Sequence, residues 1–475
     1  MHDTPVKLNH RQIAFMLCVI LTAGGELPLT KAIVSAGKID GWFAEILPML
    51  YGLLIAGFYV YLYRLYPGQN LFQISRSLAG KWGGALINLV FVTHIWLIIV
   101  RDVAVLSDFL STTLLLRTPV EMIILLYMCV AIYYMNTSVE ITSRVNDLMF
   151  PLYFLSIVLL PLLLSNELEL SRIEPILGHG FAPVLKANYL SYGWFADIVV
   201  VGAFFNTIKQ PRQLLASLRF GVVLAGFLLT LLMLVVIVVL GSSVTGRLMY
   251  PNYTLVEQIH ITDFLDRMEL MVFSIWLPAL FLKITFIMQS FLAGVNALTG
   301  NSKNALYGKQ IGWFLMLTTI VSFQSISEAF AFGNYGAAVF FLFLHLPIYA
   351  MLLLLARWKE RKKLTKSQQE QKASEEPHPT EKAQKKSAKQ KLPWYVHTSQ
   401  RTWMWWTNGL LLLAAGVVLA GTLFGDKFIW IGWIGGGLYA VCLLGALFTS
   451  YIEMRRTQHT EAREAKIQKA DAKTA

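Results

Sequence analysis

The sequence has little charge for its length. Charged side chains make up only 14% of its 475 residues, whereas soluble domains carry about 25%. Hydrophobic residues make up 56%, a share that excludes both a soluble globular protein and an intrinsically disordered chain. The hydrocarbon core of a bilayer requires roughly 20 apolar residues for each helix that crosses it. A chain of this composition therefore has enough apolar residues for about a dozen membrane spans.

Cysteine is also scarce, and catalytic motifs are missing. The three cysteines, Cys18, Cys129 and Cys442, lie inside apolar runs and form no CxxC motif or cluster with histidine. We expect them to be buried hydrophobic side chains without a disulfide, and we expect no metal site. The sequence contains no phosphate-binding loop, nucleophile elbow, HExxH motif or catalytic dyad. We therefore expect neither an enzyme nor a bound cofactor.

What the sequence does contain is a series of uncharged or nearly uncharged segments. They lie near residues 12–35, 42–63, 84–112, 119–135, 148–165, 188–207, 220–241, 270–298, 311–326, 332–356, 404–424 and 428–450. This pattern predicts an all-α integral membrane protein with a ten-helix core and two appended transmembrane helices. The predicted parts are the core at 1–358, a basic linker at 359–401, the helix pair at 402–452 and a charged tail at 453–475. Because a long polar linker joins the pair to the core, we expect the core to fold without it.

The net charge of +12 is concentrated in one place. Residues 357–391 contain 12 lysines and arginines and 5 glutamates, which is more than half of the excess. A concentration in one loop argues against nucleic acid as a partner. Basic loops stay on the cytoplasmic side of membranes, so we expect the linker, the charged tail and both chain termini to be cytoplasmic. The linker lacks apolar periodicity, and we expect it to be disordered.

The first predicted helix is interrupted near the middle of the membrane. Gly24, Gly25, Glu26 and Pro28 follow directly after Thr22. Glycine lacks a Cβ and proline cannot donate the helical hydrogen bond, so we expect the helix to break there. Backbone freed at this depth must line a cavity or be buried in protein.

The sixth predicted helix, at 188–207, also carries a glycine and a carboxylate, Gly193 and Asp197. The first and sixth helices hold corresponding places in two halves of five helices, at 11–165 and 181–356. This arrangement is typical of transporters with an inverted repeat, in which the ligand binds where the two helices break. A proline kink and an unrelated glycine would give the same pattern, and the residues alone leave that alternative open.

We expect a small ligand to bind at the two breaks. The candidate ligand-binding residues are Thr22, Gly24, Gly25, Glu26, Tyr192, Gly193, Trp194 and Asp197. Backbone groups beside the glycines suit an amino-acid carboxylate, and the aromatic side chains suit an apolar ligand group. Small residues also serve close helix packing in membranes, and aromatic residues serve ordinary packing, so both alternatives stay open.

Ionisable side chains at membrane depth are further candidates, because an unpaired charge there is costly. They are Glu26, Asp102, Asp197 and Lys283. Arg101 directly precedes Asp102, so the two side chains leave the helix in different directions, and we expect them not to pair.

Six stretches of the core occur in an order and spacing that match a known family. They are 7–12 (KLNHRQ), the break at Gly24 and Pro28, 40–42 (DGW), 117–119 (RTP), 175–178 (PILG) and 266–269 (DRME) with Trp276. Through them the chain resembles the B-subunit family of spore germinant receptors, a branch of the amino acid/polyamine/organocation transporter superfamily. The resemblance covers about residues 1–358. It implies the inverted-repeat (LeuT-like) fold, with a small ligand held at the breaks of the first and sixth helices.

The resemblance also implies a function. Members of the family look like nutrient sensors, and this chain would bind an amino acid and signal to partner subunits to trigger germination. The implied partners are an A-type membrane subunit and a C-type lipoprotein, and the implied location is the bacterial cell membrane or the inner spore membrane. A proton-coupled amino acid transporter is the alternative, and a structural subunit with a decayed site is a third possibility.

The chain departs from the family at three places. The appended pair lies outside the usual length, Asp197 stands about where a glycine falls, and Lys283 replaces a small or hydroxyl residue. In this fold the first and eighth helices face each other where sodium-coupled relatives hold a sodium ion. We therefore expect the Lys283 ammonium to substitute for that cation. Its expected partners are carbonyls around Thr22–Gly24, together with Glu26.

Overall fold

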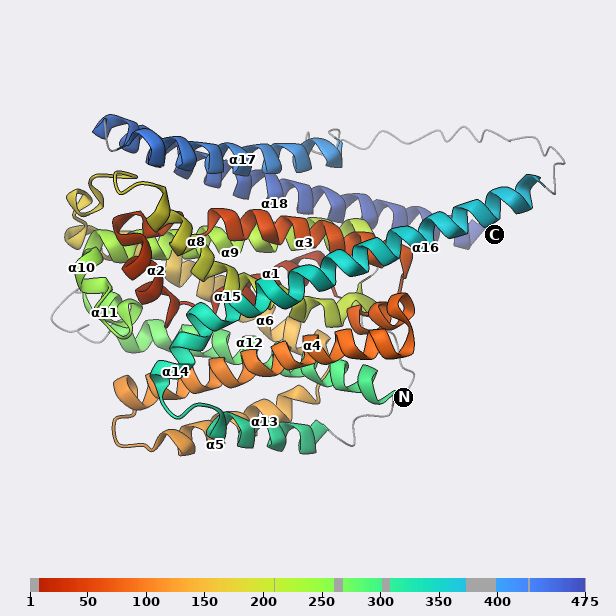
Figure 1. Ribbon diagram of the computed structural model, residues 1–475, viewed down its shortest axis with the longest axis horizontal. Coiled ribbons are helices and arrows are strands. Elements are labelled where there is room, and N and C mark those ends of the chain that lie inside the picture. Colours follow the sequence, from red (N-terminus) through yellow and green to blue (C-terminus); the bar gives the residue numbers. More distant parts are fainter. Residues whose placement is uncertain are drawn as a thin grey trace.

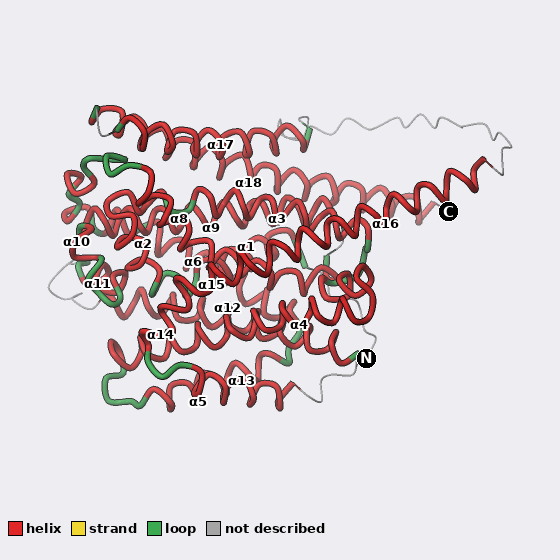
Figure 2. Tube along the Cα trace, in the orientation of Figure 1, coloured by secondary structure: helices red, strands yellow, loops and turns green. Residues whose placement is uncertain are grey.

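The computed structural model describes residues 8–208, 210–259, 268–300, 308–372, 399–425 and 428–474. Within these ranges the chain forms helices and no strands, and the long helices run roughly side by side along one axis (Figure 1). Helix occupies nearly all of the described trace (Figure 2). The predicted all-α fold is therefore confirmed.

The helices of the first half are α1 (His10–Thr22), α2 (Leu29–Gly37), α3 (Ile46–Leu65), α4 (Leu71–Phe109), α5 (Val120–Met135) and α6 (Val139–Val158). Those of the second half are α8 (Phe181–Phe195), η5 (Ala196–Thr207), α9 (Pro211–Leu240), α12 (Met268–Thr299), α13 (Gly308–Ser322), α14 (Ile326–Ala331), α15 (Ala337–Phe340) and α16 (Leu346–Lys372). The appended pair is α17 (Gln400–Phe424) and α18 (Ile429–Thr474). Shorter helices are η1 (Lys38–Phe43), η2 (Leu110–Leu114), α7 (Leu160–Leu163), η3 (Ser165–Glu167), η4 (Leu170–Ile173), α10 (Ser242–Thr245), α11 (Pro251–Glu257), η7 (Phe332–Gly336) and η8 (Phe341–His345).

Seven described helices are long and apolar enough to cross a membrane, and α5 and α6 form a further pair bent by 120°. Each predicted span contains at least one helix, but several spans are divided or short. The first span is α1 followed by α2, the sixth is α8 followed by η5, and the ninth is the short helix α13. The chain is an integral membrane protein with multiple spans.

The first span breaks where its glycines and proline predicted. Gly24 takes φ +89°, a left-handed conformation that only glycine adopts without strain. Pro28 directly precedes the first residue of α2, where its missing N–H removes no helical hydrogen bond. All residues from 21 to 30 are buried, as freed backbone at membrane depth requires.

The sixth span changes conformation beside Asp197, one of the two residues named for its interruption. Gly193 lies inside α8, and the helix tightens into the 3-10 helix η5 only at Ala196. This 3-10 segment is 12 residues long, whereas most such segments have three or four residues. Asp197 is its second residue, so the carboxylate, and not the glycine, marks the change in backbone conformation.

Parts of the predicted linker and tail are helical. Helix α16 continues to Lys372, and α18 continues to Thr474. These stretches are rich in lysine, glutamate, glutamine and alanine, which favour helix without needing an apolar face. The expectation of disorder is therefore wrong for 359–372, and residues 373–398 lie outside the described ranges.

Two of the family-like stretches meet in space. The Asp40 carboxylate accepts a hydrogen bond from the backbone N–H of Leu177 at 2.6 Å. Burial raises the pKa of Asp40 to about 7, although the N–H groups of Leu177 and His179 favour its charged form. The stretch 175–178 therefore forms one structural unit with 40–42, which lies within η1.

The appended pair packs against this unit. The Trp42 and Tyr439 rings meet edge to face, with centroids 5.5 Å apart. A Cβ on Gly421 of α17 would collide with the Leu177 side chain, so glycine permits the close approach.

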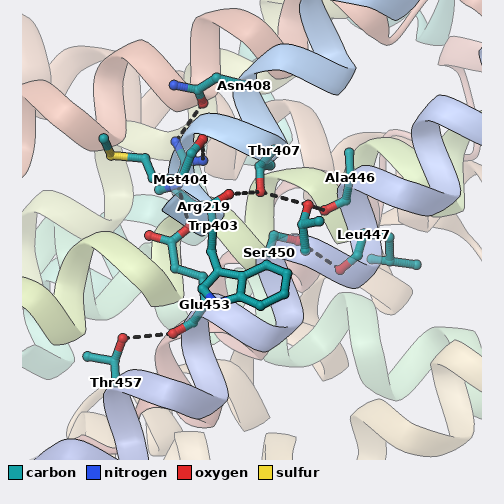
Figure 3. Close-up of polar contacts among 11 residues, drawn as sticks. Arg219, Trp403, Met404, Thr407, Asn408, Ala446, Leu447, Ser450, Glu453 and Thr457 are labelled. Carbon is teal, nitrogen blue, oxygen red and sulfur yellow. Dashed lines mark hydrogen bonds and ion pairs between the residues drawn. The ribbon is translucent and has the colours of Figure 1, made fainter. Parts of the chain in front are cut away.

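Farther along, Arg219 of α9 bonds to both helices of the pair (Figure 3). The Arg219 guanidinium donates to Glu453 of α18 at 3.0 Å. It also donates to the Asn408 side chain at 2.9 Å and to the Met404 carbonyl at 3.1 Å, both on α17. The side chains of Arg219 and Glu453 are 3% and 0% exposed. These contacts join the pair to the core, and folding of the core without the pair stays a prediction.

Breaking this ion pair should destabilise the protein. Glu453→Ala would leave the Arg219 guanidinium buried without a carboxylate, which costs about 3–5 kcal/mol. Thermal unfolding of the purified protein in detergent measures the loss. Replacing both partners, with Arg219→Met and Glu453→Leu together, should recover most of the stability, because no uncompensated charge then remains.

The matched control for that experiment is Glu140→Ala. It breaks the ion pair with Arg144, in which the side chains are 30% and 71% exposed, and exposed pairs contribute at most about 1 kcal/mol. Equal unfolding temperatures for Glu453→Ala and Glu140→Ala would contradict a structural role for the buried pair.

Candidate ligand site

The break between α1 and α2 lies beside a cluster of four charged side chains. A Cβ on Gly24 would be 3.6 Å from Asp102 Oδ2. Arg101 donates from Nε to Asp102 Oδ1 at 2.7 Å and from Nη2 to Asp197 Oδ2 at 2.9 Å. Lys283 Nζ lies 2.9 Å from Asp102 Oδ2 and 3.2 Å from Asp197 Oδ2. Each cation therefore contacts both carboxylates, and the two positive and two negative charges balance.

This cluster is closed to solvent and joins three helices. The Arg101 side chain is 1% exposed, and those of Asp102, Asp197 and Lys283 are 0% exposed. Unpaired, each charge would cost several kcal/mol at this depth. The pairs link α4, η5 and α12, so separating these helices would separate opposite charges.

Trp194 of α8 connects the cluster to the break. The Arg101 guanidinium carbon lies 3.7 Å from the centroid of the Trp194 ring, and Lys283 Nζ lies 5.2 Å from it. Both distances are within the range of cation–π attraction. A Cβ on Gly25 would approach the same ring to 3.0 Å. The absence of a side chain at Gly25 therefore allows the indole ring to lie against the broken backbone.

Glu26 belongs to a second polar group at the break. The Tyr153 hydroxyl of α6 donates to Glu26 Oε2 at 2.8 Å and lies 3.0 Å from Thr22 Oγ1. Asn252 of α11 donates to the Glu26 carbonyl and, at 3.1 Å, to Thr30 Oγ1. The ends of α1 and α2 are thus tied to two other segments of the core.

Several buried polar atoms at the site have no hydrogen-bond partner in the described part of the chain. Asp102 Oδ2 and Lys283 Nζ are among them but form an ion pair with each other. Asp197 Oδ1, an acceptor, and Trp194 Nε1, a donor, have neither kind of partner there. The two residues are one helical turn apart. Buried polar atoms are almost always hydrogen-bonded, so this donor and acceptor are available to an ammonium and a carboxylate of a small ligand.

The structure brings most of the predicted site residues together. Gly24, Gly25, Trp194 and Asp197 all lie at or beside the charged cluster, and Glu26 with Thr22 forms the adjoining polar group. Lys283 also lies there, but its partners are the carboxylates of Asp102 and Asp197 rather than the carbonyls around Thr22–Gly24 that we expected.

Two predicted site residues serve packing elsewhere. A Cβ on Gly193 would collide with the Ala338 backbone nitrogen at 2.9 Å, so this glycine allows α8 to approach α15 closely. The Tyr192 ring stacks on Phe341 and meets Tyr51 edge to face. The packing alternatives that the sequence left open fit these contacts.

Arg101, Tyr153 and Asn252 are the site residues that sequence reasoning missed. We expected Arg101 and Asp102 not to pair, yet Arg101 Nε donates to Asp102 Oδ1, because the long arginine side chain can reach the neighbouring carboxylate. A charge inside the apolar run 84–112 was the available signal for Arg101. Tyr153 gave none, since a tyrosine in an apolar run is ordinary.

The family described as "Spore germination protein" matches residues 7–330. Spore germination protein KB of Bacillus subtilis is 22% identical over 365 residues, which cover 75% of this chain and 96% of that protein. Spore germination protein YndE of Bacillus subtilis is 24% identical over 369 residues, covering 75% of this chain and 98% of that protein.

Two solved structures share the fold. Mhp1, a nucleobase-cation-symport-1 family transporter in a closed conformation with bromovinylhydantoin bound, aligns with a TM-score of 0.52 at 12% identity over 96% of this chain and 99% of its own. A mutant of the Eremococcus coleocola manganese transporter aligns with a TM-score of 0.51 at 11% identity. The alignment covers 95% of this chain and 98% of that transporter. The predicted LeuT-like inverted-repeat architecture is confirmed, and at these identities the likeness concerns the fold alone.

The contact between Gly25 and Trp194 is testable through stability. Gly25→Ala should force the buried indole ring to move, which costs about 1–3 kcal/mol, measured by thermal unfolding in detergent. Gly57→Ala is the control, because Gly57 in α3 has open space around its Cβ position and alanine favours helix. Equal or higher stability of Gly25→Ala relative to the native protein would show that the ring does not depend on this glycine.

Proposed function

The chain belongs to the spore germination protein family, as its motifs predicted, and we propose that it is the nutrient-binding subunit of a spore germinant receptor. The proposed ligand is an amino acid held where α1 gives way to α2 and α8 to η5. The proposed binding residues are Gly24, Gly25, Glu26, Trp194 and Asp197. The observation that carries this proposal is the buried donor and acceptor without partners, Trp194 Nε1 and Asp197 Oδ1.

An amino-acid zwitterion suits the charges of this site. Its ammonium would donate to Asp197 Oδ1, and its carboxylate would accept from Trp194 Nε1 and from backbone N–H groups freed near Gly24. The ligand brings one positive and one negative charge, so the cluster with Arg101 and Lys283 stays neutral overall. A ligand with a single net charge would leave an uncompensated charge in a buried site, at a cost of several kcal/mol.

Signalling would follow from competition within the cluster. In the closed site Asp197 Oδ2 is shared by Arg101 and Lys283. A ligand that contacts Asp197 changes the strength of these contacts and thereby the relative stability of arrangements of α4, η5 and α12. We propose that an A-type membrane subunit and a C-type lipoprotein respond to this change in the inner spore membrane, with both termini of this chain in the cytoplasm.

A proton-coupled amino acid transporter is the second candidate function. It is supported by Glu26, a buried carboxyl group at the break that Tyr153 holds in place, and by the similarity to transporter folds. A transporter must release its ligand on the far side of the membrane, whereas a receptor needs only to bind and signal.

Ligand-dependent thermal stabilisation tests the proposed binding. A panel of amino acids is added to the purified full chain, and we expect one or a few to raise the unfolding temperature through mass action. Trp194→Phe keeps the aromatic ring but removes the indole donor, and it should weaken this response by about tenfold, since a hydrogen bond to a charged group contributes about 1.5–3 kcal/mol.

The control variant is Trp82→Phe, because Trp82 is 84% exposed. A native protein that no amino acid stabilises would contradict the proposed ligand class, and equal responses of the two variants would move the site away from Trp194. Uptake of the stabilising amino acid into proteoliposomes, driven by a proton gradient, would favour the transporter over the receptor.

If the Lys283 ammonium substitutes for a sodium ion, ligand binding should not require sodium. Lys283→Met would leave two buried carboxylates with only Arg101, so we expect a loss of about 3–5 kcal/mol in stability. Lys283→Thr should recover stability when sodium is added, because a free cation can then occupy the vacated place. A native protein that needs sodium for binding, or Lys283→Met with native behaviour in both buffers, would contradict this role.

A further inference from the structure

A cavity of about 860 Å³ lies between the core and the appended pair. It is found where α9 and α17 begin, at the end of the bundle where α16 also ends (Figure 1). This is the end that the distribution of basic residues assigns to the cytoplasm. The cavity is separate from the charged cluster, and no residue of that cluster lines it.

The cavity is strongly basic. Four arginines from four different helices line it: Arg64 of α3, Arg212 of α9, Arg401 of α17 and Arg456 of α18. None of its lining residues is acidic, and the other polar ones are glutamine, serine and threonine. Within the described part of the chain, Arg64, Arg212 and Arg401 form no ion pair with a carboxylate. Arg212 is also close enough to Arg456 for their like charges to repel.

Backbone dipoles add to this positive potential. The 30-residue helix α9 and the 25-residue helix α17 both start at the cavity, where Gln210, Pro211, Ser399 and Gln400 are lining residues. The first turns of both helices carry N–H groups without helical partners and the positive ends of the helix dipoles. Helix N-termini combined with guanidinium groups are a recurring arrangement for binding phosphate.

Arg219, which joins the pair to α9, differs from the arginines of the cavity in its ion pairing. Arg219 lies two turns beyond Arg212 on the same helix and is fully paired, with Glu453 as its carboxylate. Among the described residues, Arg219 thus has a carboxylate partner, whereas Arg64, Arg212 and Arg401 at the cavity have none. Like charges around one cavity repel one another, and an anion in the cavity would reduce that repulsion.

We propose that this cavity binds a phosphate-bearing anion that bridges the core and the appended pair. An anionic phospholipid headgroup from the cytoplasmic leaflet is the favoured source, because the cavity lies between membrane helices, and Leu215 and Met404 give it apolar lining for the adjoining acyl chains. A soluble phosphate compound offers the same chemistry from the aqueous side. The occupant would neutralise the arginines and hold α17 and α18 against α3 and α9.

The test measures anion binding to the purified full chain. The lipid arm compares vesicles of phosphatidylcholine alone with vesicles of phosphatidylcholine and cardiolipin, and the soluble arm adds inorganic pyrophosphate in detergent. We expect cardiolipin to bind and to raise the unfolding temperature. Arg212→Gln with Arg401→Gln should weaken that binding by about fivefold for each arginine, hence about 25-fold for the double variant.

The control is Arg455→Gln. Arg455 is next to Arg456 and has the same charge, but it contacts Tyr451 and does not line the cavity. Its loss should leave cardiolipin binding within about twofold of the native protein. Thermal unfolding of the double variant is also measured in phosphatidylcholine alone. A native-like unfolding transition there shows that any lost binding reflects the cavity and not misfolding.

Each outcome decides a part of the proposal. Cardiolipin binding that fails in the double variant and persists in Arg455→Gln supports the lipid headgroup. Binding of pyrophosphate alone, with the same dependence on the arginines, supports the phosphate chemistry and overturns the lipid source. If neither probe binds, or if Arg455→Gln weakens binding as much as the double variant does, the proposal is overturned and the cavity holds only water.

Discussion

Two cations and two carboxylates buried at membrane depth constrain the core of this protein. Arg101 and Lys283 each contact both Asp102 and Asp197, so loss of any one partner leaves a charge that the bilayer cannot solvate. Helices α4 and α12 and the 3-10 segment η5 are therefore held in one arrangement. The break at Gly24 lies directly beside this cluster, and any ligand that enters must exchange contacts with it.

The same constraint acts again between the core and the appended pair. Arg219 is buried among three helices, and Glu453 with two groups of α17 satisfies its guanidinium. At the end of the bundle near α9 and α17 four arginines line a cavity, and within the described ranges Arg64, Arg212 and Arg401 form no ion pair with a carboxylate. The described part of the molecule therefore contains two closed, neutral networks and a basic cavity. A ligand at the centre competes with existing pairs, whereas an anion at the cavity would complete an unbalanced set of charges.

Sequence reasoning succeeded where the effect of a residue is local. Gly24 and Pro28 break a helix through their own backbone chemistry, so the end of α1 and the start of α2 were predictable. It failed where contacts between distant segments decide. Gly193 and Asp197 looked alike as interruptions of one apolar run, yet the glycine packs against α15 and the carboxylate meets Arg101. The polar composition of 359–372 predicted disorder, although the same residues have high helix propensity.

The sequence by itself determined that this chain is a membrane protein of many helices, that the first helix breaks, and that charges at membrane depth must find partners. These follow from apolar length, from backbone chemistry and from the cost of an unpaired charge, which are properties of single residues and short segments. Only the tertiary structure decided the identity of the partners. Arg101 and Asp197 are 96 positions apart and Arg219 and Glu453 are 234 apart, so each pair forms only when packed helices bring the two side chains together.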